Sequence, residues 1–171
     1  ISVGDAVAPV IAGVPTGATV NCQSIPPAAF VTVTDNCDLD VQPVFSETIL
    51  PGACTDSYVL VRAWTATDEC GNVSTESQQI TINDTENPVL TGIPADVVGD
   101  CDQIPTVPPV GTVQATDNCD TDVQISFVET PLANTECPAL TDLIRTWTAT
   151  DDCGNTASAS QIIHKVDTTD P

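Results

Sequence analysis

Residues 60–72 read LVRAWTATDECGN, and residues 143–155 repeat them as LIRTWTATDDCGN. In both stretches apolar and polar residues alternate up to an aspartate, and a Cys-Gly-Asn run follows. Alternation with a period of two predicts a β-strand, and a Gly-Asn pair directly after it predicts a turn. The octet TATDECGN (65–72) is therefore either a catalytic or metal site that occurs twice, or the signature of a repeated fold.

A second pair of matching stretches supports the repeated fold. TDNCDLDVQPVFSET (34–48) matches TDNCDTDVQISFVET (116–130), and each copy has one tryptophan and four cysteines in the same order. Self-similarity of this kind indicates tandem repeats. Because the sequence contains no methionine, we expect it to be an excerpt from a longer array. The expected parts are the end of a preceding repeat's last strand (1–5), repeat 1 (6–84), repeat 2 (85–167) and the start of a linker to a following repeat (168–171).

The composition of each repeat predicts an all-β fold. Threonine and valine are abundant, and 14 prolines and 9 glycines interrupt the chain before any amphipathic helix could form. Several short strands between turn signals, in roughly 80 residues, favour an immunoglobulin-like β-sandwich. We therefore predict two tandem immunoglobulin-like β-sandwich domains, with a closed barrel as the alternative architecture.

The eight cysteines indicate disulfides rather than zinc. No two cysteines form a CxxC pair, and the chain has a single histidine, His164. Structural zinc sites usually bring cysteines in closely spaced pairs, often with histidine. Disulfides persist in oxidising compartments, so this count predicts two disulfides in each repeat and an extracellular location.

Strand placement suggests which cysteines pair. If the strands that end in TVTDNC and WTATDEC run the same way on opposite sheets, the cysteines after them meet at one end and the other two meet at the opposite end. Each bridge closes a loop of about 30 to 35 residues, worth roughly 3–4 kcal/mol in a chain-entropy estimate. Four cysteines allow three connectivities, so the other pairings stay open. The predicted pairs are Cys22–Cys54, Cys37–Cys70, Cys101–Cys137 and Cys119–Cys153.

The charge balance limits the partners. The chain has 24 acidic and 3 basic residues, a net charge of −21. Such a charge opposes binding to nucleic acid or to an anionic membrane surface, and no apolar run is long enough for a transmembrane helix. We therefore expect neither nucleic acid nor direct membrane contact. The charge suits cation binding, although acidic secreted proteins also gain solubility from it.

The motif W-T-A-T-D-x-C-G-N, followed by a short strand and D-T-x-x-P, resembles the hyalin repeat (HYR) and related immunoglobulin-like repeats. These occur in long secreted bacterial surface proteins, including large adhesins and gliding-associated proteins. The resemblance covers nearly all of both copies. HYR repeats often carry a cysteine after the Gly-Asn turn, whereas Cys70 and Cys153 precede it here, so the chain is more similar to the cysteine-bearing bacterial variant. The resemblance implies an extracellular spacer, adhesive or fibre-forming role without catalysis.

Acidic residues recur at three places in each copy: in the linker, in the DNCDLD or DNCDTD loop, and at the end of the octet strand, where Asp68-Glu69 and Asp151-Asp152 stand. In an immunoglobulin-like sandwich these segments meet where the linker from the previous repeat enters. Calcium takes six to eight oxygen ligands, so the sequence predicts calcium at these junctions. The alternative is that the aspartates only cap turns. The predicted ligands are Asp5, Asp35, Asp38, Asp40, Asp68, Asp84, Glu86, Asn87, Asp117, Asp120, Asp122, Asp151, Asp167 and Asp170.

No motif favours an enzyme. Paired carboxylates could serve a glycosidase. However, the array duplicates every acidic group, and we expect no aromatic-lined cleft that could hold a sugar. The available tryptophans, Trp64 and Trp147, share one strand position that is typical of a core. His164 is expected on a strand face, and Arg62 and Arg145 are expected to pair with a nearby carboxylate or carbonyl.

The sequence therefore predicts a structural repeat unit of a long extracellular protein, which forms a stiff stalk or fibre with calcium at its junctions. The expected partners are neighbouring repeats and lateral copies in a fibre. The alternative is an adhesin repeat that binds carbohydrate or a surface protein. A binding array tends to diversify its loops, and the stretches 42–57 and 124–142 diverge between the copies.

Overall fold

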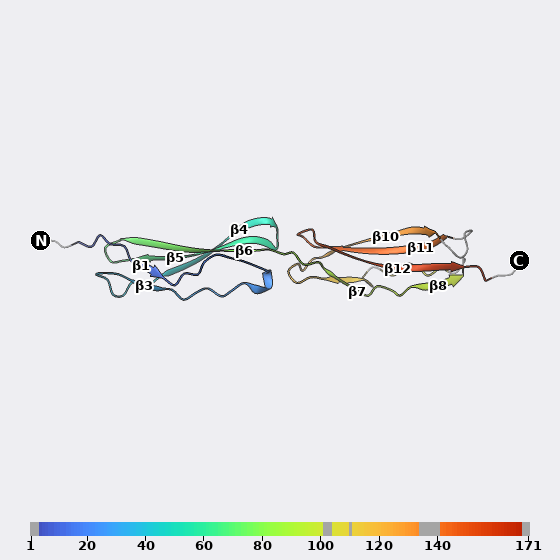
Figure 1. Cartoon of the computed structure of the whole chain (residues 1–171), viewed down its shortest axis with the longest axis horizontal. Helices are drawn as coiled ribbons and strands as arrows, with labels where there is room; N and C mark the ends of the chain where they lie inside the picture. Colours follow the sequence, from blue (N-terminus) through green and yellow to red (C-terminus); the bar gives the residue numbers. More distant parts are fainter. Residues whose placement is uncertain (1–3, 101–103, 110, 134–140, 169–171) are drawn as a thin grey trace. The chain divides into compact units, whose positions relative to one another are not determined.

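The computed structural model describes residues 4–100, 104–109, 111–133 and 141–168. Within these ranges the chain is all-β, as predicted, and its helical content is one 3₁₀ turn, η1 (Cys22–Ser24). The chain divides into two compact units, Ile1–Asp84 and Thr85–Pro171, here called unit 1 and unit 2. Each unit contains one copy of the octet, and Figure 1 shows the strands of each.

Unit 1 contains a four-stranded and a two-stranded sheet. The larger sheet has the order β2-β6-β5-β4, in which β2 runs parallel to β6 and the other neighbours are antiparallel. The smaller sheet pairs β1 with β3, and β1 also contacts β5 and β6. The strands are β1 (Val10–Ala12), β2 (Ala18–Val20), β3 (Thr32–Thr34), β4 (Val44–Cys54), β5 (Ser57–Thr67) and β6 (Val73–Ile82).

Unit 2 repeats this arrangement. Its larger sheet has the order β10-β11-β12-β8, again with one parallel pair, β12 with β8, and its smaller sheet pairs β7 with β9. β7 contacts β12, as β1 contacts β6 in unit 1. The strands are β7 (Val89–Thr91), β8 (Val97–Asp100), β9 (Gln114–Thr116), β10 (Gln124–Ala133), β11 (Thr141–Thr150) and β12 (Thr156–Val166).

The octet strand supplies the core of each unit. Burial in β5 alternates with the predicted period of two, and Leu60 packs with Ile80 and Ile82 of β6. Trp64 is 2% exposed and Trp147 is 5% exposed, which confirms that both are core residues. Each lies opposite a phenylalanine of the neighbouring strand, with ring centroids 5.3 Å apart in unit 1 and 5.2 Å apart in unit 2.

Buried polar side chains fasten loops to the larger sheets. Arg62 lies opposite Glu47, with Nε 2.9 Å from Oε2, and Arg145 lies opposite Glu129 at 2.6 Å. The Arg145 guanidinium also donates to the carbonyls of Pro105 and Thr106. Both arginines therefore pair locally, as expected. In each unit a buried glutamine donates to the carbonyl of a loop: Gln78 to Thr16 at 3.0 Å, and Gln161 to Ala95 at 2.8 Å.

Candidate functional site

The end of the octet forms a closed turn between two long strands. The amide of Asn72 donates to Asp68 Oδ1 at 2.8 Å, and its side-chain Nδ2 donates to Oδ2 at 2.6 Å. The amide of Gly71 donates to the Asp68 carbonyl, and Gly71 has a φ of +88°. Asp151 and Asn155 make the same two side-chain bonds, each at 2.8 Å. The octet is therefore a fold signature whose aspartate stabilises a turn.

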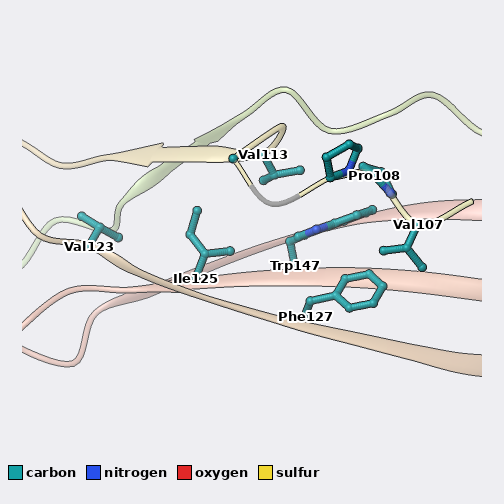
Figure 2. A pocket seen from close by; sticks show the side chains of 9 residues that line it. Val107, Pro108, Val113, Val123, Ile125, Phe127 and Trp147 are labelled. Atoms are coloured by element: carbon teal, nitrogen blue, oxygen red, sulfur yellow. The ribbon is translucent and has the colours of Figure 1, made fainter.

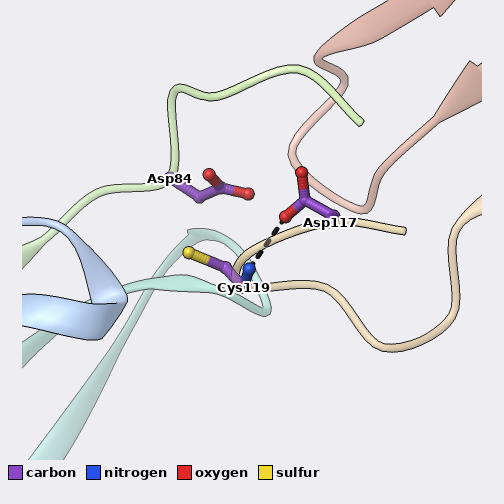
Figure 3. Close-up of side chains that lie close together, drawn as sticks. All are labelled: Asp84, Asp117 and Cys119. Atoms are coloured by element: carbon purple, nitrogen blue, oxygen red, sulfur yellow. Dashed lines mark hydrogen bonds between the residues drawn. The ribbon is translucent and has the colours of Figure 1, made fainter. Parts of the chain in front are cut away.

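The loop after β3 and the loop after β9 share a second aspartate arrangement. Asp35 Oδ1 accepts from the amides of Cys37 and Asp38 at 2.9 and 3.0 Å. In unit 2, Asp117 Oδ1 accepts from the amides of Cys119 and Asp120 at 2.8 and 3.1 Å; Figure 3 shows the first of these bonds. In both loops the other oxygen, Oδ2, is buried and accepts no hydrogen bond from any described residue. A buried carboxylate oxygen without a partner is costly, so it marks a position that a ligand could occupy.

In unit 1 the acidic segments meet in a three-carboxylate cluster. One carboxylate oxygen each from Asp5, Asp35 and Asp68 lie within 4.8 Å of one another. Asn36 and Asn72 tie the N-terminal segment to this place, because their side-chain amides donate to the Asp5 carboxylate and carbonyl, each at 3.3 Å. The sequence predicted that a linker segment meets these two loops, but it assigned Asp5 to a preceding repeat, whereas Asp5 belongs to unit 1 here. It also did not single out the two asparagines. Their only signal was their repetition in both copies.

The cluster borders a small cleft of about 170 Å³. Asp38 lines this cleft and its Oδ2 accepts from the amide of Glu69 at 3.2 Å, which joins the loop after β3 to the octet turn. The counterpart in unit 2 is the bond from the amide of Asp152 to Asp120 Oδ2 at 2.9 Å. The residues that line the cleft are Asp5, Cys37, Asp38, Leu39, Asp68, Glu69 and Cys70.

Other predicted ligands lie outside this cluster. The backbone amides of Asp40 and Asp122 donate to the carboxylates of Asp38 and Asp120. Asp40 and Asp122 therefore contribute a backbone hydrogen bond to their loops rather than a ligand. Asp84 is buried, and its backbone amide donates to Ser57 Oγ at 3.0 Å. The predicted convergence of the Asp84 linker with loops of unit 2 involves both units and stays a prediction. Of the remaining predicted ligands, Asp170 lies outside the described residues, Asp151 is buried in its turn, and Glu86, Asn87 and Asp167 are exposed.

Two groups that border the cleft, Asp5 and Cys37, have shifted pKa values. The backbone amide of Val7, which donates to Oδ1 at 3.0 Å, is the main cause that lowers the pKa of Asp5, and the Asn36 amide contributes. Loss of solvent, followed by the nearby Asp5 carboxylate, raises the pKa of the Cys37 thiol. Carboxylate oxygens are hard donors, so a cluster of three carboxylates suits calcium better than a soft metal.

The cysteines correct one predicted pair. Cys22, Cys54, Cys119 and Cys153 are disulfide-bonded, and they are the members of two predicted pairs. Cys37 and Cys70 are free thiols, so the predicted Cys37–Cys70 disulfide is wrong for this structure. Both free thiols line the cleft but lie on exposed loops, whereas their counterparts Cys119 and Cys153 are half-buried. The predicted Cys101–Cys137 pair lies outside the described residues.

Unit 2 also holds an apolar pocket of about 400 Å³. Figure 2 shows the rings of Trp147 and Phe127 on one side and Val113 and Pro108 on the other. The sequence predicted no aromatic-lined cleft, because both tryptophans were expected in the core alone, and this pocket shows that expectation to be wrong for unit 2. The proline-rich segment that covers the tryptophan carries no periodic pattern that would place it there.

No family model matches the chain, and no curated protein matches it. Among solved structures, human mucin-like protocadherin EC1-2 has 11% identity and a TM-score of 0.38, over 95% of this chain and 100% of that one. Drosophila N-cadherin EC1-4 also has 11% identity and a TM-score of 0.38, over 94% of this chain and 50% of that one. Likeness at these scores carries no argument about function. In the part of the chain that the structure describes, no helix has the length and apolarity needed to cross a bilayer.

Proposed function

We propose that this chain is a segment of an extracellular array of immunoglobulin-like β-sandwich repeats, whose role is structural and whose junctions calcium stiffens. The observation that carries the proposal is the cluster of Asp5, Asp35 and Asp68, which contains a buried oxygen without a hydrogen-bond partner among the described residues. Three carboxylates this close repel one another unless a cation neutralises them. The bonded cysteines support the extracellular location, because disulfides persist in oxidising compartments.

The repeat extends this argument to the junction between the units. Asp5 precedes the first strand of unit 1, and by sequence alignment its counterpart before unit 2 is Asp84. The counterparts of Asp35 and Asp68 are Asp117 and Asp151, which keep the same hydrogen bonds and the same unpartnered oxygen. We therefore infer that the last residues of one repeat complete the calcium site of the next. A linker that is ligated together with loops of the following repeat loses its freedom to bend.

Replacing Asp35 and Asp117 with asparagine separates calcium binding from turn stabilisation. Asparagine keeps Oδ1, which accepts the two loop amides, and replaces the unpartnered Oδ2 with an amide donor. In the wild-type chain we expect calcium at about 100 times its Kd to raise the free energy of unfolding by about 2.7 kcal/mol for each site. In the D35N/D117N variant we expect that gain to disappear, while stability in chelator stays the same or rises because one charge of the cluster is gone. Calorimetric melting with calcium and with chelator measures both.

The matched control is D40N/D122N, which makes the same charge change in the same loops outside the cluster. It should keep the wild-type response to calcium, and magnesium at equal concentration should produce a much smaller gain. If calcium changes the melting of neither the wild type nor the variants, the aspartates serve turn chemistry alone and the calcium proposal is wrong.

The apolar pocket of unit 2 favours a second candidate, an adhesin repeat that binds a ligand directly. Phe127, which is 39% exposed, would offer stacking surface to an apolar or sugar ring, and the buried Trp147 lines the same pocket. Titration of a panel of oligosaccharides, read by the fluorescence of Trp147 in a chain with Trp64 replaced by phenylalanine, tests it. Saturable quenching that the Phe127→Ala variant abolishes would support the adhesin function over the purely structural one.

A further inference from the structure

One edge of each larger sheet is long and bare. Among the described residues β4 pairs only with β5, and β10 pairs only with β11. Residues 44–53 of β4 and all of β10 are exposed, and the opposite edges are the three-residue β2 and the four-residue β8. An unpaired strand presents a row of backbone donors and acceptors to any other extended chain, and natural proteins usually shield such edges with lysines, prolines or bulges.

These edges carry little of that shielding. The seven residues VFSETIL (44–50) and QISFVET (124–130) precede the single proline of each strand and contain no lysine. At about 3.3 Å per residue, seven residues give an uninterrupted edge of about 23 Å. Exposed apolar side chains stand along both: Val44, Phe45, Ile49 and Leu50 in β4, and Ile125, Phe127 and Val128 in β10.

The edges are also neutral in a strongly negative chain. Each strand has one charged residue, Glu47 or Glu129, and each glutamate is paired with a buried arginine of the neighbouring strand. The chain has only 3 basic residues against 24 acidic ones, so two of the three are used to neutralise these two edges. Two copies of the chain repel each other over most of their surface, and the edges are where they repel least.

We propose that β4 and β10 are the lateral assembly edges of the array, and that each pairs antiparallel with the same kind of edge strand in a second copy of this chain. A second copy of this chain is the partner that fits these edges best. The unpaired edge strand occurs once in each repeat, and a partner built from the same repeats presents the same series of edges. Pairing of like edges is self-complementary, as two-fold symmetric association requires. Each edge glutamate stays paired with its arginine, so the glutamates of the two copies do not repel each other as free charges would.

The test uses the 171-residue chain in chelator, so that its outcome is independent of the calcium sites. Sedimentation velocity should show self-association that rises with protein concentration and with sodium chloride, because salt screens the net charge. Hydrogen exchange should show added protection at high protein concentration within residues 44–50 and 124–130, where edge amides become bonded.

The matched pair of variants is T48E/T130E and S77E/S160E. Both add two negative charges by replacing exposed hydroxyl residues at equivalent positions of the two units, the first pair on the edge strands and the second on β6 and β12 inside the sheets. We expect T48E/T130E to weaken association about tenfold or more, since facing charges destabilise strand pairs, and S77E/S160E to weaken it far less. The proposal is overturned by a chain that stays monomeric in high salt, by equal effects of the two variants, or by association without protection of these amides.

Discussion

Asp68 accepts hydrogen bonds with both carboxylate oxygens from Asn72, and one of its oxygens also belongs to the three-carboxylate cluster. These two roles are compatible, because each oxygen has two lone pairs and a turn amide occupies one. Asp35 differs, since only Oδ1 serves the turn and Oδ2 has no described partner. At this scale, turn chemistry and cation binding are two uses of the same carboxylates rather than alternatives.

The glycine of the octet turn yields a prediction for single residues. Gly71 and Gly154 have φ values of +88° and +87°, and an added Cβ would meet nothing within 4 Å at either. The whole cost of Gly71→Ala or Gly154→Ala should therefore be backbone strain, about 1–2 kcal/mol in the free energy of unfolding. Urea denaturation of each variant measures it. Gly4→Ala, which also has open space and no positive φ, is the control and should change stability little; an equal loss there would contradict this explanation.

The central strands β5 and β11 show how equivalent elements can differ in energy. Both place a buried arginine opposite a glutamate, but Arg145 also donates to two loop carbonyls. In unit 1, the Nη1 atom of Arg62 is buried without a hydrogen-bond partner among the described residues. The same strand register therefore ties a loop to the sheet firmly in unit 2 and less so in unit 1.

Because of this difference, replacing the buried arginine with methionine should destabilise unit 2 more than unit 1. Arg145→Met should lower the free energy of unfolding by about 2 kcal/mol or more beyond the loss caused by Arg62→Met, because hydrogen bonds from a charged donor contribute about 1.5–3 kcal/mol each. Chemical denaturation, followed through the tryptophan fluorescence of each unit, compares them. If Arg62→Met costs as much as Arg145→Met, the loop carbonyl bonds do not carry the difference.

For the whole molecule, the net charge of −21 sets how the chain responds to its solvent. Self-repulsion opposes the compact state and keeps copies apart, and cations relieve both effects. The two proposals concern different regions of the surface. The negatively charged carboxylate clusters would bind calcium, whereas the neutral edge strands would let two arrays approach each other. A fibre built in this way would depend on divalent ions for stiffness and on ionic strength for lateral contact.

The whole-molecule charge predicts that simple salt stabilises the calcium-free chain. Raising sodium chloride from about 0.01 M to about 0.15 M shortens the Debye length from about 30 Å to about 8 Å, which screens repulsion between units and within them. The melting temperature in chelator should therefore rise. Scanning calorimetry of dilute protein, at which self-association is absent, measures it, and a fall in melting temperature would show that attractive ion pairs outweigh the repulsion.

The sequence by itself determined the repeat, the all-β class, the core position of Trp64 and Trp147 and the turn of each octet, because strand alternation and turn chemistry act between near neighbours in the chain. The sequence also predicted that the segments of Asp5, Asp35 and Asp68 meet, because a linker and two loops lie at one end of an immunoglobulin-like sandwich. Only the tertiary structure decided which carboxylate oxygen lacks a partner, that Cys37 and Cys70 stay free, and that β4 and β10 form bare edges. These features depend on strand order and on contacts between residues some thirty or more positions apart, for which the local pattern holds no signal.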